Sequence, residues 1–253
     1  MGHLKLKIRE DINFLKKPNW VVSKRKDLKK IIIDDEFGSY ELATTSQFGL
    51  PSRLDKIILY FLKYKLLDKN SDYHKIETTR HEVATHVFTD SDNFSQNRYA
   101  RILTALDKWQ AVTLIFSGSF YEKDTYVDKK FSIIDEFTIT PKKNLLITFN
   151  EAYVKQIKET QFYKIVNFYE CKNLTTPVSL RLYEIILKNL TENVIFYVDI
   201  KKLADKLTIQ KKDYESQILA AIEAAVEQIN QHTNLKITFC YEKNLSLCIF
   251  KKA

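Results

Sequence analysis

The sequence predicts an α+β fold in which one unit, three helices followed by a β-hairpin, occurs twice in tandem. Its 253 residues are 45% hydrophobic and include only four glycines and four prolines, which is the composition of a well-packed globular protein. Residues 91–134 follow the pattern of a polar turn, an amphipathic helix and a hairpin. Comparing the sequence with itself shows that segments of the first half recur, in the same order, in the second half.

Residues 1–38 are predicted to form a basic N-terminal arm. Residues 1–35 contain ten Lys and Arg but only five Asp and Glu, so they carry more than half of the net charge of +8. The positive charge is densest around Arg25 and Lys26. A cluster of this kind can neutralise phosphates without reading a base sequence. Alternatively, the many scattered lysines reflect biased codon usage and form solvated surface.

The first repeated unit is expected in residues 39–145. Its first helix covers Arg53–Leu62, where apolar residues recur with helical spacing, and a second, short helix follows Thr78-Thr79. In the third helix, within residues 93–109, apolar residues recur at steps of three and four, and basic residues follow this spacing on another face. The hairpin of the unit is predicted within residues 112–134, which are rich in β-branched and aromatic side chains around a charged turn.

The second unit is expected in residues 146–253, with the domain boundary near 140–150. Four segments of the first half recur there at offsets between 116 and 128. The matches are Arg53–Leu62 with Arg181–Leu190, Val83-Ala84 with Leu203-Ala204, Ile102–Leu106 with Ile218–Ile222, and Tyr121–Lys123 with Tyr241–Lys243. Residues 137–140 and 145–149, on either side of Pro141-Lys142-Lys143, alternate like strands and are expected between the two units.

The sequence does not predict an enzyme, and no cofactor or metal ion is expected. It lacks the glycine-rich motif of phosphate-binding loops, and four glycines spread over the chain do not readily build such a loop. His81 and His86 are five positions apart, so on a helix they face different directions and are poor partners for one metal ion. No His-x-His pair of the kind that a nicking relaxase requires is present.

The chain is expected to be cytoplasmic. No apolar run reaches the ~18 residues of a membrane span, and the charged N-terminus lacks the apolar core of a secretory signal. The three cysteines (Cys171, Cys240 and Cys248) are odd in number and have no C-x-x-C spacing. This usage favours reduced thiols over a disulfide framework or a zinc knuckle.

A helix with basic residues on its open face, backed by a hairpin with a lysine-bearing tip, is typical of a winged-helix domain, which places this helix in a DNA groove. An ordinary amphipathic helix packed on a hairpin is the alternative. Arg can pair with guanine, Asn and Gln can pair with adenine, and Ser, Lys and helix N-termini can bind phosphate. The expected DNA-binding residues are Arg25, Lys26, Thr78, Thr79, Arg80, Ser95, Gln96, Asn97, Arg98, Arg101, Lys123, Lys129, Lys130, Gln210, Lys211, Lys212, Tyr214, Gln217 and Lys243.

The third helix of the second unit is expected to contact DNA only through its first turns. Glu223 and Glu227 lie further along this helix, and their negative charges would repel phosphates. From the sequence alone, either unit could dominate the affinity for DNA.

An ordered set of motifs runs through nearly the whole chain, from about residue 20 to residue 250. The motifs are Ser23–Lys26, Gly49–Pro51 with Arg53–Asp55, Asn97–Tyr99 with Ile102–Lys108, Phe131–Asp135, and Pro177 with Arg181–Ile185. Together they resemble bacterial plasmid replication initiator proteins of the Rep, or replication initiator protein A, type.

This resemblance implies two tandem winged-helix domains that bind repeated origin sequences (iterons) in double-stranded DNA. It implies that the protein opens an adjacent AT-rich region and recruits the host initiator and the replicative helicase. It also implies a homodimer that represses its own gene, a monomer that initiates replication, no enzymatic activity and no nucleotide cofactor.

Other functions stay open at the level of sequence. A transcriptional repressor can be built from the same winged helices, because function resides in the site and its partners rather than in the fold. A dimerisation or partner-binding module would bind DNA weakly, without sequence preference and with a shallow salt dependence. A nicking relaxase has the least support, because it would require metal-dependent cleavage by a tyrosine.

Overall fold

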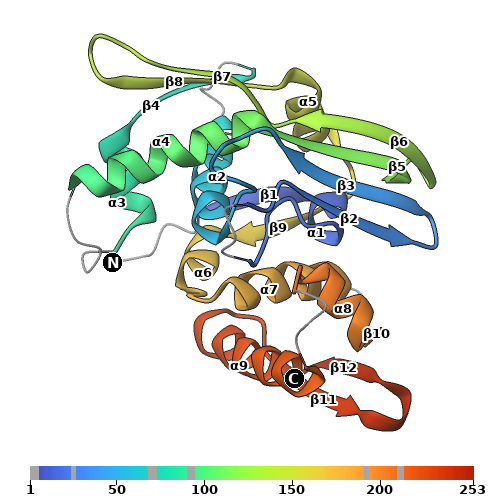
Figure 1. Ribbon diagram of the computed structural model, residues 1–253. Coiled ribbons are helices and arrows are strands. Elements are labelled where there is room, and N and C mark those ends of the chain that lie inside the picture. Colours follow the sequence, from blue (N-terminus) through green and yellow to red (C-terminus); the bar gives the residue numbers. More distant parts are fainter. Residues whose placement is uncertain (1–5, 24–26, 68–72, 90–94, 191–193, 210–213) are drawn as a thin grey trace.

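The computed structural model describes residues 6–23, 27–67, 73–89, 95–190, 194–209 and 214–253, except for the side chains of Ser95 and Gln96. Helices and small β-sheets alternate along the chain, which confirms the predicted α+β class. Figure 1 shows a larger part, formed by the first two thirds of the chain, stacked on a smaller part that is formed by the last third. Among the described residues, no helix is long and apolar enough to cross a membrane.

The larger part contains six helices and nine strands among its described residues. The helices are α1 (Ile12–Lys16), α2 (Arg53–Leu66), α3 (Arg80–Val87), α4 (Ser95–Ala111), α5 (Glu151–Glu159) and α6 (Phe168–Asn173). The strands are β1 (Lys7–Asp11), β2 (Lys30–Asp35), β3 (Gly38–Thr44), β4 (Lys75–Thr79), β5 (Val112–Glu122), β6 (Thr125–Ser132), β7 (Ile134–Ile139), β8 (Asn144–Phe149) and β9 (Tyr163–Asn167). The smaller part consists of α7 (Pro177–Asn189), β10 (Ile195–Asp199), α8 (Ile200–Lys206), α9 (Glu215–His232), β11 (Ile237–Glu242), the 3₁₀ turn η1 (Lys243–Leu245) and β12 (Leu247–Lys252).

Two three-stranded antiparallel sheets have the same connectivity. In the larger part the order is β4-β8-β7, and in the smaller part it is β10-β12-β11. Each of these sheets is built from a single strand and a hairpin. The single strand, β4 or β10, lies between the first and second helices of the repeated unit. The hairpin, β7-β8 or β11-β12, follows the third helix, and its second strand pairs with the single strand. The repeated units are therefore α2-β4-α3-α4-β7-β8 and α7-β10-α8-α9-β11-β12.

A hairpin does form within residues 112–134, as predicted, but its assignment to the first unit is wrong, because the hairpin of that unit is β7-β8. β5 and β6, which occupy most of those residues, join β2 and β3 in a separate sheet of order β2-β3-β5-β6. β5-β6 is thus an additional hairpin, inserted between the third helix and the hairpin of the unit. The segments around Pro141, expected as strands between the units, are the hairpin of the first unit itself.

The third helices of the two units match at an offset of 120, not at the predicted 116. α4 buries Ile102, Ala105, Leu106 and Trp109. Each of these has a buried counterpart in α9 at a position 120 residues later, namely Ile222, Ala225, Val226 and Ile229. The second helices match at the same offset, because Val83, Ala84 and Val87 of α3 correspond to the buried Leu203, Ala204 and Leu207 of α8.

The described residues of the N-terminal segment are part of the fold rather than an arm. β1 pairs in antiparallel fashion with β9, more than 150 residues later in the chain. Phe14 and Trp20 are fully buried, and α1 packs against α7 of the second unit. The segment was expected to be an arm because of its charge, but its apolar residues bring it between the two units, where they are removed from water.

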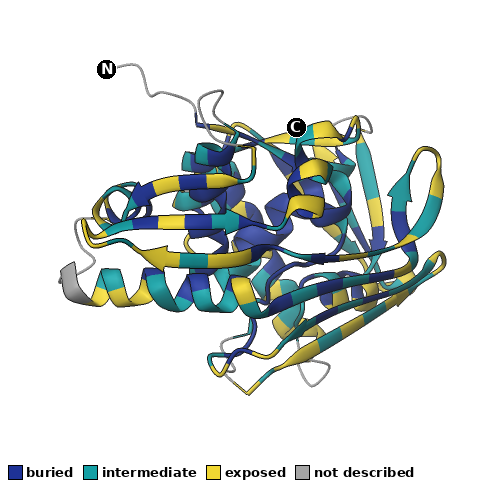
Figure 2. Cartoon of the chain, turned by 90° about the horizontal axis from the view of Figure 1, so that it is seen from above, coloured by how far each residue is buried: buried dark blue, intermediate teal, exposed yellow. Residues whose placement is uncertain are grey.

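A fully buried cluster of charged side chains lies where α2 and α7 meet. It contains Glu10 of β1, Lys56 and Lys63 of α2, and Arg181 and Glu184 of α7, none of which exposes any surface. Glu10 accepts hydrogen bonds from both lysines, and Arg181 Nη1 lies 2.8 Å from Glu184 Oε2. Figure 2 shows buried residues concentrated in the middle of the molecule, with exposed residues along the hairpins and the outer helix faces. The cluster therefore links the N-terminal segment and both units inside the core.

Candidate nucleic-acid interface

Three arginines gather at the corner between α3 and α4. Arg80 begins α3, and its guanidinium carbon lies 5.3 Å from the centre of the Tyr99 ring of α4. Arg98 and Arg101 of α4 lie over the ring of Phe88, at 5.8 and 5.3 Å from its centre. Contact with aromatic faces orders arginine side chains without neutralising their charge. We call these three arginines the arginine corner.

The arginines of the arginine corner differ in how far their side chains are exposed and available to contact DNA. Arg98 is half-buried and donates a hydrogen bond of 2.8 Å from Nη2 to the Thr89 carbonyl, which fixes its direction. Arg101 and Asn97 are exposed on the same helix, one turn apart. An exposed Arg and an exposed Asn near the start of a helix suit contacts to base edges in the major groove.

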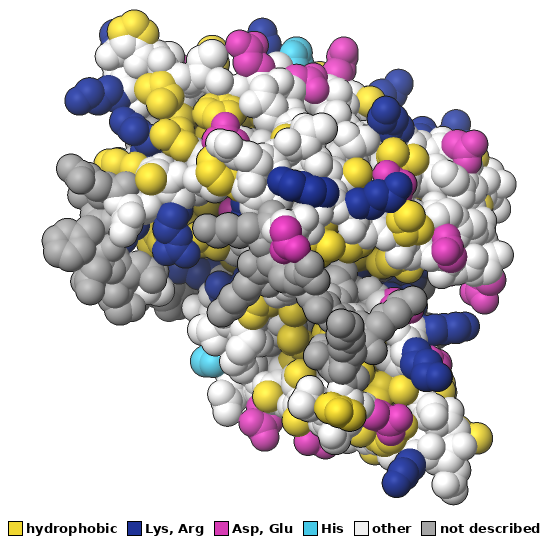
Figure 3. Space-filling view, in the orientation of Figure 1, with side chains coloured by type: hydrophobic (Ala, Val, Ile, Leu, Met, Phe, Trp, Pro, Cys, Tyr) yellow, Lys and Arg dark blue, Asp and Glu magenta, His cyan; other side chains and the backbone are white. Residues whose placement is uncertain are grey.

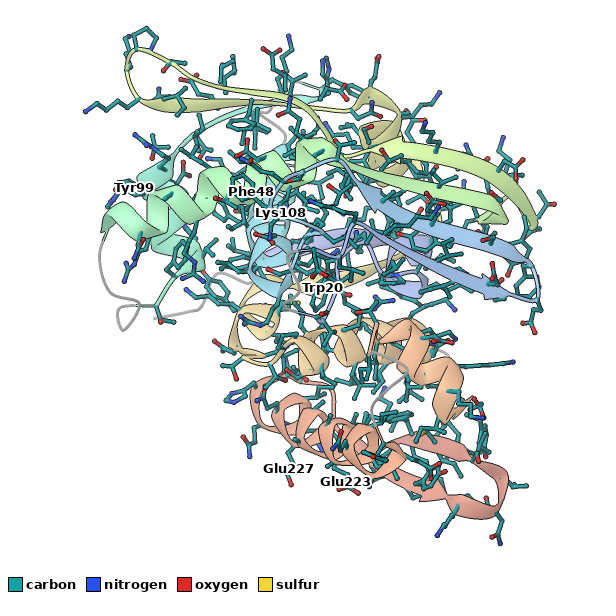
Figure 4. The ribbon with its side chains drawn as sticks, viewed as in Figure 1. Trp20, Phe48, Tyr99, Lys108, Glu223 and Glu227 are labelled. Atoms are coloured by element: carbon teal, nitrogen blue, oxygen red, sulfur yellow. The ribbon has the colours of Figure 1, made fainter. Side chains whose placement is uncertain are left out.

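α4 is held on α2 by its C-terminal half, so its N-terminal half is the part that faces outward. Lys108 Nζ lies 2.8 Å from Asp55 Oδ2, and Trp109 Nε1 donates a hydrogen bond of 2.8 Å to the Asp55 carbonyl. Asp55 also closes the capping box of α2 with Ser52. Lys108 thus has a structural role, although it follows the basic spacing of the helix. Figure 4 shows Tyr99 at one end of α4 and Lys108 towards the middle of the molecule.

The hydroxyl groups of Thr78 and Thr79 stabilise the start of α3 and are not free to bind DNA. Thr78 is only 3% exposed, and its hydroxyl donates a hydrogen bond to Glu82. The Thr79 hydroxyl caps α3 by accepting from the backbone N–H of Glu82. Partial burial raises the pKa of Glu82, but hydrogen bonds from Lys65 and Thr78 outweigh this effect and lower it below its usual value. The Thr78 side chain therefore faces the interior, contrary to its expected role.

The predicted wing lysines lie far from the arginine corner. Lys123, Lys129 and Lys130 belong to the inserted β5-β6 hairpin, and Lys129 pairs with Glu122 at 3.2 Å. Figure 1 shows the tip of β5-β6 at the opposite end of the molecule from the N-terminus of α4, and the view from above in Figure 2 agrees. These lysines are exposed or half-buried, but they cannot flank a groove that is occupied by the start of α4.

The hairpin that does extend towards the N-terminal end of α4 is β7-β8. Its tip carries Lys142 and Lys143, both exposed, and Lys143 adopts a positive φ of 64° in the turn. The sequence signal for these residues was present as two alternating segments around a Pro-Lys-Lys turn. The sequence alone favours β5-β6 as the wing, because that hairpin directly follows α4 in the chain.

The second unit offers fewer basic contacts. Tyr214, at the N-cap of α9, is 76% exposed, and Gln217 and Lys243 are also exposed. Glu223 and Glu227 are exposed on the open face of α9, and Figure 4 shows both pointing away from the body of the molecule. On the face shown in Figure 3, acidic side chains appear along the lower edge of this unit. The acidic face predicted from the sequence is confirmed.

Val22 and Ser23, which precede the basic N-terminal cluster in the chain, lie beside the second unit. Ser23 lines a pocket together with Thr208, Ile209 and Gln217, which flank the turn between α8 and α9. The backbone N–H of Val22 donates a hydrogen bond of 2.8 Å to the Thr208 hydroxyl. Of the expected DNA-binding residues, Arg25, Lys26, Gln210, Lys211 and Lys212 lie outside the described residues, as do the side chains of Ser95 and Gln96. In the part of the chain that is described, no group of His, Cys, Asp and Glu could hold a metal ion.

Comparison with protein-family models gives no match, and comparison with curated proteins gives none either. Solved structures do match. The crystal structure of selenomethionine derivatives of domains 2 and 3 of RctB superposes with a TM-score of 0.63 at 10% sequence identity, covering 95% of this chain and 98% of that chain. A second crystal structure of RctB domains 2-3 matches with a TM-score of 0.53 at 9% identity, covering 95% and 97% of the two chains.

These matches show that the chain shares its fold with RctB domains 2 and 3 over nearly the full length of both. The shared part includes most of both repeated units, because only 5% of the chain is left out in either match. At this level of identity the comparison concerns the fold alone. It does not extend to the Rep type that the sequence motifs resemble.

Proposed function

We propose that this protein is a replication initiator that binds a specific sequence in double-stranded DNA. RctB, whose domains 2 and 3 share the fold, is a replication initiator. The observation that carries the proposal for this chain is the arginine corner, where Arg80, Arg98 and Arg101 surround the start of α4 beside the exposed Asn97. Arg and Asn are the residue types that read guanine and adenine in the major groove.

In this proposal each repeated unit is a winged helix. α4 and α9 are the recognition helices, and the hairpins β7-β8 and β11-β12 are the wings. Support comes from the matching sheet orders and from the common offset of 120 between the buried stripes of α4 and α9. A basic hairpin tip beside a recognition helix would contact the phosphates that flank the groove.

The two units would then contribute unequally. The N-terminal half of α4 presents Asn97 and Arg101 to solvent, whereas the open face of α9 presents Glu223 and Glu227. The phosphates of DNA would attract the N-terminal half of α4 and would repel the acidic face of α9. We therefore propose that the first unit reads the sequence and that the second unit contacts DNA only near Tyr214 and Gln217.

The finer features of the proposal follow from the resemblance to plasmid initiators. They are binding to origin direct repeats, opening of an adjacent AT-rich region, recruitment of the host initiator and the replicative helicase, and repression of its own gene by a homodimer. No enzymatic activity is part of the proposal, and the protein would act in the cytoplasm on a replicon.

The acidic open face of α9 favours a second candidate function for the second unit, namely contact with a protein partner. Glu223 and Glu227 lie one turn apart and form no ion pair within the described part of the chain. Replacing both by Gln should leave DNA binding unchanged and should weaken the capture of a basic partner protein. Improved DNA binding by this variant would instead show that the acidic face of α9 lies against DNA.

A fluorescence-anisotropy titration tests the proposed function. The protein is titrated against a duplex with the direct repeats of its own replicon and against a scrambled duplex, each at two salt concentrations. The proposal expects a preference for the repeats of roughly 10³ or more. Equal, weak binding to both duplexes would reject a role in recognising those repeats.

A further inference from the structure

A pocket between the larger and the smaller part of the molecule is lined by lysines from three helix C-termini. It has a volume of about 440 Å³ and lies between the β2-β3 turn, the C-terminus of α1 and the second unit. The lysines that line it are Lys16, Lys17, Lys188, Lys202 and Lys206. Lys16 belongs to α1, Lys188 to α7 and Lys206 to α8, so the larger and the smaller part both contribute.

Arg181 holds these helix ends together. Its Nη2 donates to the Lys16 carbonyl at 3.1 Å, and its Nε donates to the Lys206 carbonyl at 3.0 Å. One guanidinium group thus bridges the backbone of Lys16 in the larger part and that of Lys206 in the smaller part. The two side chains consequently start from neighbouring points and line the same pocket.

Carboxylates also line the pocket, but they are either engaged or exposed. Asp35 pairs with Lys17 at 2.7 Å and with Lys16 at 3.4 Å. Asp199 caps α8 by accepting from the backbone N–H groups of two lysines. The other three, Asp34, Glu36 and Asp205, are exposed at the rim.

Lys206 lies near several other cations. It is half-buried, and it has no hydrogen bond or ion pair through its ammonium group within the described residues. Burial, and then the positive charges of Lys188, Lys16, Arg181 and Lys17, lower the pKa of Lys206 to about 8. A lysine in the last turn of a helix normally benefits from the helix dipole. Here the neighbouring cations outweigh that benefit, so an anion in the pocket would relieve their repulsion.

We propose that the pocket between the larger and the smaller part is a binding site for a phosphate group, held by Lys206 together with Lys16 and Lys188. The phosphate can be a free polyphosphate or a phosphodiester of bound duplex DNA, because both present the same anionic oxygens to lysines. A phosphate bound there would connect the end of α1 to the ends of α7 and α8, and would thereby fix the larger and the smaller part relative to one another.

The test uses inorganic pyrophosphate as the probe and the full chain in both arms. In the first arm, calorimetric titration at pH 7 is expected to show binding of pyrophosphate to the wild type. Lys206→Met keeps most of the apolar side chain and should weaken this binding at least tenfold. Lys201→Met is the matched control, since Lys201 is an exposed lysine of the same helix that does not line the pocket.

The second arm measures affinity for duplex DNA and rests on the proposed function. If pyrophosphate does not bind but Lys206→Met alone weakens duplex binding and lowers its salt dependence, the phosphate belongs to DNA. If Lys206→Met and Lys201→Met behave alike in both arms, the proposed site is refuted. A wild type that binds no duplex rejects the proposed function, while the pyrophosphate arm still decides the site.

Discussion

Lys56 of α2 and Glu184 of α7 face one another inside the core at matching positions of the repeated sequence. Their Nζ and Oε1 atoms are 3.6 Å apart, and neither side chain exposes any surface. The two residues are fourth in the matched segments Arg53–Leu62 and Arg181–Leu190. Tyr60 and Trp20 donate hydrogen bonds to the two carboxylate oxygens of Glu184. The repeat thus places opposite charges where its two copies meet.

The first prediction concerns this pair. Replacing Glu184 by Gln leaves Lys56 and Arg181 buried with less negative charge, so the free energy of unfolding should fall by about 3–5 kcal/mol. Lys56→Met should have an effect of similar size. The double variant should lose less than the sum of the two, because each single change already breaks the same contact. Urea unfolding of the four proteins measures this coupling, and strictly additive losses would show that the pair does not interact.

The second prediction concerns stability in acid. Burial raises the pKa of Glu10, but attraction to Lys56 and Lys63 outweighs this effect and holds the pKa below 4.5. The folded state therefore favours the ionised carboxylate, and its contribution is fully present above about pH 4.5 and is lost as the pH falls through the lowered pKa. Glu10→Gln should reduce stability at pH 7 by about 3 kcal/mol and flatten its decline in acid. An unchanged acid profile would assign the decline to other carboxylates.

The third prediction concerns Lys206. Its pKa is lowered from 10.5 to about 8, so the unfolded chain binds its proton more tightly, and the charged form costs stability at every pH below about 8. Lys206→Met should therefore raise the free energy of unfolding at pH 7 by about 1–2 kcal/mol, with allowance for solvent screening. The gain should shrink between pH 8 and pH 10.5. A variant that is less stable than the wild type at pH 7 would contradict the crowding of positive charge in the pocket.

The fourth prediction separates the two hairpins of the first unit. Lys142→Ala and Lys143→Ala, at the tip of β7-β8, should weaken binding to all DNA sequences alike and reduce the salt dependence by about one ion each. Lys129→Ala, on the inserted β5-β6 hairpin, should leave both properties unchanged, although the sequence pattern alone predicts the reverse. Titrations at several salt concentrations distinguish these outcomes. A stronger effect of Lys129 would place the wing on β5-β6.

The sequence predicts those features that are coded locally. The α+β class, the acidic face at Glu223 and Glu227, and the match of Val83-Ala84 with Leu203-Ala204 depend on short-range patterns, and the structure agrees with them. The one-turn error in matching α4 with α9 has a simple origin. α9 repeats small and apolar residues at both Ile218 and Ile222, so two registers fit its pattern, and only burial separates them.

Features that depend on distant parts of the chain could not be predicted in this way. The pairing of β1 with β9 joins segments more than 150 residues apart, and no periodicity reveals it. The insertion of β5-β6 is equally hidden, because a hairpin next to α4 in sequence has the pattern of a wing whichever sheet it joins. The density of charge in the N-terminal segment predicts an arm, and only the structure shows that Phe14 and Trp20 within it are buried.

The most direct test of the account is the effect of the arginine corner on sequence preference. The ratio of affinities for direct-repeat and scrambled duplexes is measured by fluorescence anisotropy for the wild type, Arg98→Ala, Arg101→Ala and the control Lys129→Ala. We predict that each arginine variant loses about 1–3 kcal/mol of binding to the repeats and little binding to the scrambled duplex, while the control matches the wild type. Unchanged ratios in both arginine variants would contradict the claim that the start of α4 reads the DNA sequence.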